Sequence, residues 1–374
     1  MAKFLFCLPR FHTNAEPWVR ILSGAGHCVQ IDVLRVGATE DHRLIRPHVV
    51  ATSPLTSRLA RLLPRKADPD FYRTPGLLGY WREMTRIAPD VVIVRGLSRW
   101  FMRVAALTAI LQGRRLIIYD QDDPLPRRYS STWLRRASLR MLGLRHVTAR
   151  MAASVRERSP AFAETLPFGR PAADPQMLAP TVRRARKSPQ ILMVAKYRAR
   201  KGHRALIAAL ADPIMPTNFC AVFCGEEADG ADVACRAELE REVERQGLSD
   251  KVSFRANLDR AAMQQLYRES DIFVLPSVSE PAAVSPIEAA WNGCAALMDR
   301  SAGTRHYLPP EDRFVFDATD PHEIALKLAA LVADPNLLDE ARHACRNRVA
   351  AISSDAVILE KFQRMLPGRA SRAP

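Results

Sequence analysis

The chain lacks the features that mark several classes of protein. Its seven cysteines are odd in number, scattered, and never spaced as Cys-x-x-Cys, which argues against a disulfide framework and against a metal site. No apolar run approaches the roughly 20 residues of a membrane span, and residues 1–10 are too short and wrongly flanked for a secretion signal. We therefore expect a cytoplasmic protein that uses neither a metal nor another cofactor.

Lysine is scarce although the chain is strongly basic. The formal net charge is +15, yet only eight of the 55 basic residues are lysine, and the arginines are dispersed. Because no helix-turn-helix, zinc finger or RNA-binding signature gathers them, we expect no nucleic-acid partner. Residues 131–145 mix apolar residues and arginines at helical spacing. This pattern favours a helix packed on a sheet, with peripheral contact at an anionic inner membrane face as the alternative.

Strand-like and helix-like segments alternate along both halves of the chain, which predicts two doubly wound α/β domains. We assign residues 1–168 to the first domain, 169–189 to a linker rich in proline, alanine and arginine, 190–350 to the second domain, and 351–374 to a helix that crosses back to the first. The N-terminal half predicts strands at 4–8, 29–34, 91–95 and 116–119, and helices near 18–24, 77–87 and 100–111. The C-terminal half predicts strands at 191–195, 219–225, 251–255 and 271–276, and helices at 239–247, 263–270 and from 285.

Two glutamates separated by seven residues, Glu280 and Glu288, are the most informative feature. Glu280 lies in the loop after the predicted strand 271–276, and Glu288 lies in the first turn of a helix that starts with Ser285 at the N-cap and Pro286 at N1. In open α/β sheets, ligands bind where the carboxyl end of a strand leads into a helix, whose free N–H groups favour a diphosphate. Since the two carboxylates can bind a ligand's hydroxyls, the pattern suits a nucleotide sugar.

A structural role can also explain one of these glutamates. Ser285 and Glu288 stand three residues apart, as in a capping box, so that Glu288 would close its own helix. Glu280 precedes a proline and lies outside any predicted helix, which leaves it without a comparable structural role. For Glu288 both interpretations stay open at this point.

A basic turn follows another predicted strand, about eighty residues upstream. Strand 191–195 leads through Lys196 and Lys201-Gly202 into a helix rich in alanine, leucine and isoleucine. Departure of a nucleoside diphosphate develops negative charge on its oxygens, and fixed cations lower that barrier without a metal. Because lysine is scarce, Lys201 stands out from the basic background. The alternative is a pair of ordinary solvated cations.

Together the two blocks resemble the signature of the family-4-type retaining glycosyltransferases of the GT-B fold. The resemblance rests on Glu-x7-Glu after a strand ending in Leu-Pro-Ser, on the following Ala-Ala-Trp-Asn-Gly, and on the upstream Lys-Gly. It covers residues 190–350 well and the rest by architecture only. It implies two Rossmann-like domains facing across a cleft, with the acceptor bound by residues 1–168 and the nucleotide sugar by 190–350.

The resemblance also implies roles for single residues. Glu280 would meet the donor sugar, and Glu288 the nucleotide ribose. Lys196 and Lys201 would neutralise the leaving diphosphate. The other donor-side candidates are Gly202 beside the lysine, the backbone of Ala283, Val284 and Ser285 at the phosphates, and Arg255 and Ala256 at the base.

Two residues depart from the family's pattern. Lys196 stands where relatives have arginine, and an ammonium cannot make the two-pronged phosphate contact of a guanidinium. Ala283 follows Ala282 in a segment where the family usually has glycine, and a methyl group narrows the approach of backbone to a phosphate. We therefore expect these departures to affect how tightly the donor binds or which donor is used.

The acceptor side carries weaker signals. GT-B relatives commonly have a glycine-rich loop after the first strand, but this loop has no glycine, and its candidates are His12 and Asn14. A loop histidine without a visible partner is more often a surface residue. After strand 116–119, GT-B relatives often have a histidine that lines the active site, so the resemblance implies that Asp120 or Gln121 faces the cleft. Acidic residues that open a loop can also serve only the turn.

We expect a metal-independent hexosyltransferase that moves a sugar from a nucleoside-diphosphate-sugar to a hydroxyl of a glycan, lipid or small-molecule acceptor. No strong base is needed if a phosphate oxygen of the leaving group takes the acceptor's proton. One alternative is a metal-dependent transferase of the GT-A type, in which Asp120 and Asp122 form an Asp-x-Asp that holds a divalent ion. The other is a non-catalytic nucleotide or nucleic-acid binding protein on the same fold.

Overall fold

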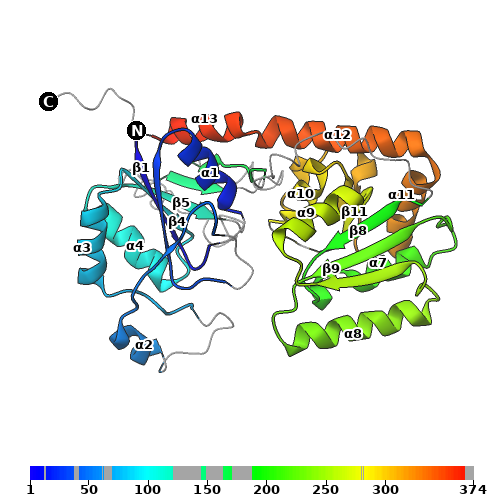
Figure 1. The fold of residues 1–374 in the computed structure, drawn as a ribbon, viewed down its shortest axis with the longest axis horizontal. Helices are drawn as coiled ribbons and strands as arrows, with labels where there is room; N and C mark the ends of the chain where they lie inside the picture. The colour runs from blue at the N-terminus through cyan, green and yellow to red at the C-terminus, as the bar shows by residue number, and fades with distance from the viewer. Residues whose placement is uncertain are drawn as a thin grey trace, which may run out of the picture. The chain divides into compact units, whose positions relative to one another are not determined.

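The computed structural model describes residues 1–11, 14–37, 42–60, 62, 70–120, 145–148, 163–170, 188–278, 280 and 282–366. The chain divides into two compact units (Figure 1). The N-terminal unit is Met1–Ala172 with Asp355–Pro374, and the C-terminal unit is Ala173–Ser354. Among the described residues, none of the helices is both long enough and apolar enough to cross a membrane.

The N-terminal unit contains, in its described part, a parallel sheet of seven strands in the order β3-β2-β1-β4-β5-β6-β7. Its strands are β1 (Lys3–Leu8), β2 (Cys28–Val33), β3 (His48–Val49), β4 (Val91–Arg95), β5 (Arg115–Asp120), β6 (Arg145–Thr148) and β7 (Ala163–Thr165). The helices described in this unit are α1 (Glu16–Gly24), α2 (Pro54–Ala60), α3 (Leu77–Ile87), α4 (Trp100–Leu111) and α13 (Asp355–Met365).

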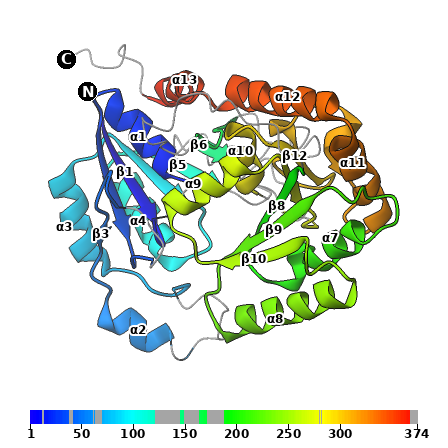
Figure 2. The same ribbon diagram turned by 45° about the vertical axis from the view of Figure 1, so that its right-hand side comes forward.

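Alternation along the strands gives this sheet two apolar faces. Leu5 and Cys7 of β1 belong to a buried cluster with residues of α3 and α4. Phe4, which points to the other face because side chains alternate along a strand, meets Phe362 of α13 edge to face. The sheet is therefore covered by helices on both faces, as a purely parallel sheet requires (Figure 2).

Helix α13 follows the C-terminal unit in sequence but belongs to the N-terminal unit. Asp355 at its start accepts two hydrogen bonds from the Arg20 guanidinium of α1, at 2.6 and 2.9 Å. The Trp18 indole of α1 donates to the Pro167 carbonyl at 2.8 Å and packs near Phe362. The contacts of Arg20 with Asp355 and of Trp18 with Phe362 hold the last helix against α1.

The C-terminal unit has, in its described part, a parallel sheet of six strands in the order β10-β9-β8-β11-β12-β13. The strands are β8 (Gln190–Val194), β9 (Cys220–Gly225), β10 (Val252–Ala256), β11 (Ile272–Leu275), β12 (Ala295–Asp299) and β13 (Val315–Phe316). The helices are α7 (His203–Leu210), α8 (Gly230–Arg245), α9 (Arg260–Glu269), α10 (Ser285–Trp291), α11 (Pro321–Ala333) and α12 (Pro335–Ser353). Because every strand runs the same way, all their carboxyl ends lie at one edge.

Several expected elements differ from the structure or fall outside it. In place of one helix over 351–374, α12 ends at Ser353 and α13 covers Asp355–Met365. Helix α8 begins at Gly230, well before the predicted start at 239, because the Asp229 carboxylate caps it by accepting from the backbone N–H groups of Ala231 and Asp232. The basic segment 131–145 lies outside the described residues except for Arg145, which begins β6.

Candidate functional site

The candidate site lies where the C-terminal sheet changes its winding direction. Strands β8 and β11 are neighbours in the sheet although they are distant in sequence. Strand β8 leads into the basic turn at 196–202, and β11 leads into the loop that carries Glu280. Since both strands are parallel, their following loops meet at one edge of the sheet. This switch point is where open α/β sheets bind ligands.

Gly202 lets the two loops touch. Its backbone has φ +79°, a left-handed conformation, and a Cβ atom placed on it would lie 1.9 Å from the carbonyl oxygen of Pro276. Only glycine therefore fits between the end of the basic turn and the end of β11. The close approach brings the side chain of the preceding residue, Lys201, to the β11 loop.

Glu280 is at the centre of the resulting polar cluster. Only 8 % of the residue is exposed, and its Oε2 atom accepts a hydrogen bond from the Lys201 ammonium. The Ser277 hydroxyl donates to the same oxygen at 2.9 Å, and the Arg200 guanidinium donates to it at 3.2 Å. Sequence reasoning paired Glu280 with Lys201 as parts of one site but missed Ser277 and Arg200, although both directly adjoin its motifs.

The cluster keeps Glu280 ionised. Burial acts to raise the pKa of its carboxyl, but the hydrogen bond and positive charge of Lys201 outweigh burial, with further help from Ser277 and Arg200. The net result is a pKa below the usual value for glutamate. A buried, ionised carboxylate beside a half-buried cation can orient a polar ligand at this edge.

Lys196 has a different environment. Its ammonium lies 2.6 Å from the Glu226 carboxylate, which follows β9, and the lysine side chain is 43 % exposed. The next residue, Tyr197, is fully buried, and its hydroxyl lies within hydrogen-bond distance of the carbonyls of Phe223 and Arg255, at 3.0 and 2.6 Å. The structure thus places Lys196 at the same edge of the sheet but pairs it with Glu226.

Glu288 does not form the predicted capping box. The N-cap of α10 is Val284, which makes no side-chain cap hydrogen bond, and Ser285 is the first helical residue. The Ser285 hydroxyl donates instead to the Val194 carbonyl at the end of β8, at 3.2 Å. The half-buried Glu288 carboxylate accepts from the hydroxyl of Tyr267 in α9, at 3.0 Å. The expected N-cap at Ser285 was therefore wrong by one residue, since the hydroxyl that would have capped the helix binds a neighbouring strand.

Other donor-side candidates lie at a strand end or on the loops around these groups. Ala283 is buried before α10. Arg255 and Ala256 end β10, and Arg255 accepts through its carbonyl from Tyr197. Asn257, which sequence reasoning missed, has a left-handed backbone with φ 53° and accepts from the Glu227 N–H at 2.9 Å. It fixes the loop after β10 to the loop after β9.

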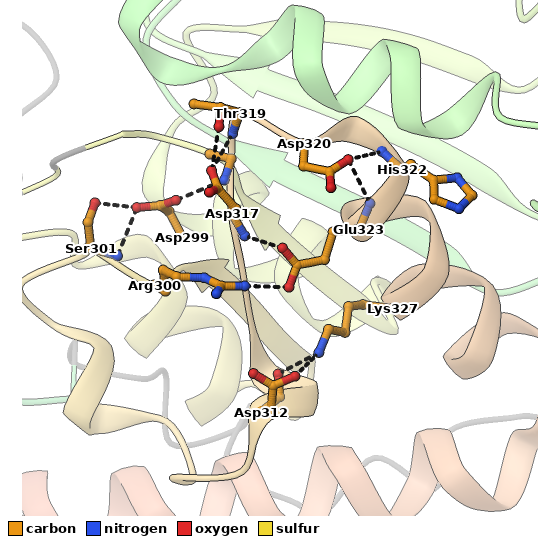
Figure 3. A network of polar contacts seen from close by, with 11 residues as sticks. Asp299, Arg300, Ser301, Asp312, Asp317, Thr319, Asp320, His322, Glu323 and Lys327 are labelled. Atoms are coloured by element: carbon orange, nitrogen blue, oxygen red, sulfur yellow. Dashed lines mark hydrogen bonds and ion pairs between the residues drawn. The ribbon is translucent and has the colours of Figure 1, made fainter.

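A second network holds the loop after β12 (Figure 3). Asp299 is 4 % exposed, and its carboxylate accepts from the backbone N–H groups of Ser301 and Ala318, each at 2.9 Å. Two residues further, the Gly303 N–H donates to the Glu280 carbonyl at 2.8 Å. Asp299 therefore supports the backbone of Glu280 through this loop. No motif identified it, because the contact joins segments that only the fold brings together.

The acceptor-side candidates belong to the N-terminal unit. Asn14 lies just before α1, and Asp120 is the last residue of β5. His12, Gln121 and Asp122 lie outside the described residues. Within the part of the chain that the structure describes, no group of three or more histidine, cysteine, aspartate or glutamate side chains could hold a metal ion.

Part of the sequence is similar to known proteins. Residues 179–350 match the family model described as Glycosyl transferases group 1. A glycogen synthase from Deinococcus deserti is 29 % identical over 138 residues, which cover 37 % of this chain and 29 % of that protein. The chain thus aligns with less than a third of that curated relative's length.

Solved structures match over nearly the whole chain. Sucrose-phosphate synthase from Thermosynechococcus elongatus has a TM-score of 0.68 and 18 % identity, covering 97 % of this chain and 98 % of its own. HepE from Anabaena, in complex with UDP and glucose, has a TM-score of 0.71 and 17 % identity, covering 98 % and 99 %.

These likenesses confirm the predicted GT-B fold, with two parallel sheets flanked by helices, and they are compatible with the family-4-type resemblance. The sequence of residues 179–350 thus matches the model of the Glycosyl transferases group 1 family, and the chain has the GT-B fold.

Proposed function

We propose that this protein is a retaining glycosyltransferase that moves a sugar from a nucleoside-diphosphate-sugar to a hydroxyl of a glycan, lipid or small-molecule acceptor. The observation that carries the proposal is the contact between Lys201 and Glu280 at the switch point of a group 1 glycosyl transferase domain. HepE, a structural neighbour, has been solved in complex with UDP-glucose, which supports a nucleotide sugar as the donor here.

Each group at this edge has a task in the proposed reaction. Lys201 and Lys196 stabilise the negative charge that develops on the leaving diphosphate. Glu280 orients the donor sugar, and Glu288 accepts from ribose hydroxyls. The backbone at Ala283–Ser285 faces the phosphates, Gly202 sets the position of Lys201, and Arg255 with Ala256 lies beside the base.

The proposed chemical step needs no protein base. The bond between the anomeric carbon and the diphosphate oxygen breaks, and its electron pair leaves with the nucleoside diphosphate. The acceptor hydroxyl attacks the anomeric carbon from the same face, and its proton passes to an oxygen of the departing phosphate. Lys201 and Lys196 lower the activation barrier for departure of the diphosphate, and no metal ion is needed.

The test is release of nucleoside diphosphate from a panel of nucleotide sugars, with and without chelator. Metal-independent transfer predicts release that chelator does not alter. Release that chelator abolishes would support the metal-dependent alternative at Asp120 and Asp122, and no release with any sugar would support a non-catalytic binding protein. With a productive acceptor, proton NMR should show a product that keeps the donor's anomeric configuration, and an inverted product would contradict retention.

We further propose that the chain makes peripheral contact with an anionic membrane face, since residues 131–145 carry arginines among apolar residues. Co-sedimentation with anionic vesicles that is lost at high salt would support this contact. Absence of binding, or binding that ignores salt, would contradict it.

A further inference from the structure

Glu288 is held by a residue outside both motifs. It lies in the first turn of α10, where a glutamate side chain has several rotatable bonds and is half exposed. The hydroxyl of Tyr267, near the end of α9, lies 3.0 Å from Oε2 of this carboxylate. A hydrogen bond to one carboxylate oxygen restricts the rotation of the group and so favours some directions in which it can accept other hydrogen bonds.

Tyr267 is a rigid donor. It is 3 % exposed, its ring lies 6.3 Å from that of Phe273 in β11, and its backbone carbonyl accepts from the Cys294 thiol at 3.2 Å. Burial, together with the charge of Glu288, raises the pKa of the Tyr267 hydroxyl, so it keeps its proton and donates. A buried hydroxyl without a partner would be costly, and the carboxylate supplies that partner.

We propose that Tyr267 is a positioning residue for nucleotide recognition: it donates to Glu288 and holds that carboxylate in the direction from which it binds the ribose hydroxyls of the donor. This inference rests on the proposed function, because it needs Glu288 to face the ribose. It predicts that Tyr267 contributes to binding only when those hydroxyls are present.

The experiment compares a nucleotide with its dideoxy counterpart. Titration calorimetry measures the Kd of UDP and of GDP for the wild-type chain, and the tighter of the two is then compared with its 2′,3′-dideoxy form. Tyr267→Phe should weaken binding of the ribose nucleotide by roughly 3- to 10-fold, the cost of leaving one flexible side chain unfixed, and leave the Kd of the dideoxy form unchanged. In turnover with the active nucleotide sugar, KM should rise by a similar factor while kcat stays near the wild-type value.

Two variants distinguish the positioning role of Tyr267 from the proposed role of Glu288 on which it rests. Glu288→Ala should abolish the preference for the ribose nucleotide. If it does not, or if neither nucleotide binds the wild type, the proposed role of Glu288 fails. If Glu288→Ala abolishes the preference but Tyr267→Phe keeps it in full, or if Tyr267→Phe weakens both nucleotides equally, the positioning role of Tyr267 is overturned.

A matched control comes from the N-terminal unit. Tyr80 is also buried and donates to a buried carboxylate, that of Asp32, at 2.9 Å. Tyr80→Phe makes the same chemical change and should leave the nucleotide preference intact. If Tyr267→Phe does not fold, Glu288→Asp serves instead: its carboxylate is one methylene short of Tyr267, so it should reduce the preference at least 3-fold, and a full preference would overturn the inference.

Discussion

Gly202 and Pro276 approach each other so closely that a Cβ atom on residue 202 would lie 1.9 Å from the proline carbonyl oxygen. The glycine ends the basic turn after β8, and the proline follows β11. This single backbone contact places Lys201 against Glu280. The geometry of the site therefore depends on a residue that offers no side chain at all.

Gly202→Ala should be destabilising and should impair activity. The methyl group must move backbone atoms of the β11 loop, and the left-handed conformation adds its own strain, so we expect a loss of about 3 kcal/mol in the free energy of unfolding. Urea denaturation measures this loss. Gly247→Ala is the matched control, because Gly247 has φ +68° and no atom within 4 Å of an added Cβ. It should cost only about 1–2 kcal/mol, and equal losses in the two variants would show that the Pro276 contact has no effect.

Lys201→Ala should lower turnover far more than stability. Removing one fixed cation from a developing diphosphate should reduce kcat by about 10²–10³-fold, whereas the Glu280 carboxylate keeps Ser277 and Arg200 as hydrogen-bond donors. We expect the free energy of unfolding to fall by only about 1–2 kcal/mol. Steady-state kinetics and thermal denaturation give the two numbers.

A second lysine serves as the control for that experiment. Lys327 of α11 is likewise paired with a carboxylate, that of Asp312, and we assign it no part in the reaction. Lys327→Ala should leave kcat unchanged. An unaltered rate in Lys201→Ala would remove Lys201 from the mechanism.

The protein should lose stability as the pH falls from about 6.5 to 4. Two histidines lie buried or half-buried in the folded chain. Burial is the main cause that lowers the pKa of His203 to about 4, and it lowers the pKa of His306 to about 4 in the same way. Between these values and the ordinary histidine pKa the unfolded chain binds more protons than the folded one, so acid favours unfolding, by about 3 kcal/mol for each group. Urea denaturation at several pH values should show this slope.

Single substitutions identify the source of that slope. His203→Phe keeps an aromatic ring near Tyr197 and Phe223 and should flatten the slope. His322→Gln should not flatten it, because Asp212 raises the pKa of His322, whose stabilising effect is present at low pH and is lost as the pH rises. A His203→Phe slope equal to that of the wild type would contradict the assignment.

Phe362→Ala should strongly destabilise the N-terminal unit. Phe362 of α13 is 1 % exposed and meets Phe4 and Trp18 edge to face. Deleting a buried aromatic ring costs about 3–5 kcal/mol, which chemical denaturation followed by tryptophan fluorescence can measure. Gln363→Ala, at the exposed next position, should change stability little. Similar effects of both changes would mean that α13 does not stabilise the unit through its apolar face.

The sequence predicts most helices and strands because their patterns are local. Helices at 77–87 and 100–111 match α3 and α4 in full, and the strand at 91–95 matches β4. Helix starts are harder to predict. Asp229 extends α8 toward its N-terminus, and Ser285 donates to β8 instead of capping α10.

The pairing of loops was predictable, whereas their supporting contacts were not. Lys201 and Glu280 could be assigned to one site because the two blocks that carry them resemble one glycosyltransferase signature, and both follow predicted strands. Tyr267 and Asp299 support that site through contacts between helices and loops that are distant in sequence. Such contacts depend on the packing of side chains, and the spacing of residue types along the sequence does not predict them.

The most direct test of the central claim is a crystal structure with the nucleotide sugar that the turnover assay selects. The account predicts the Lys201 ammonium within hydrogen-bond distance of a diphosphate oxygen, the Glu280 carboxylate on a hydroxyl of the sugar, and the Glu288 carboxylate on the ribose. A donor bound without contact to any of these three side chains would contradict it.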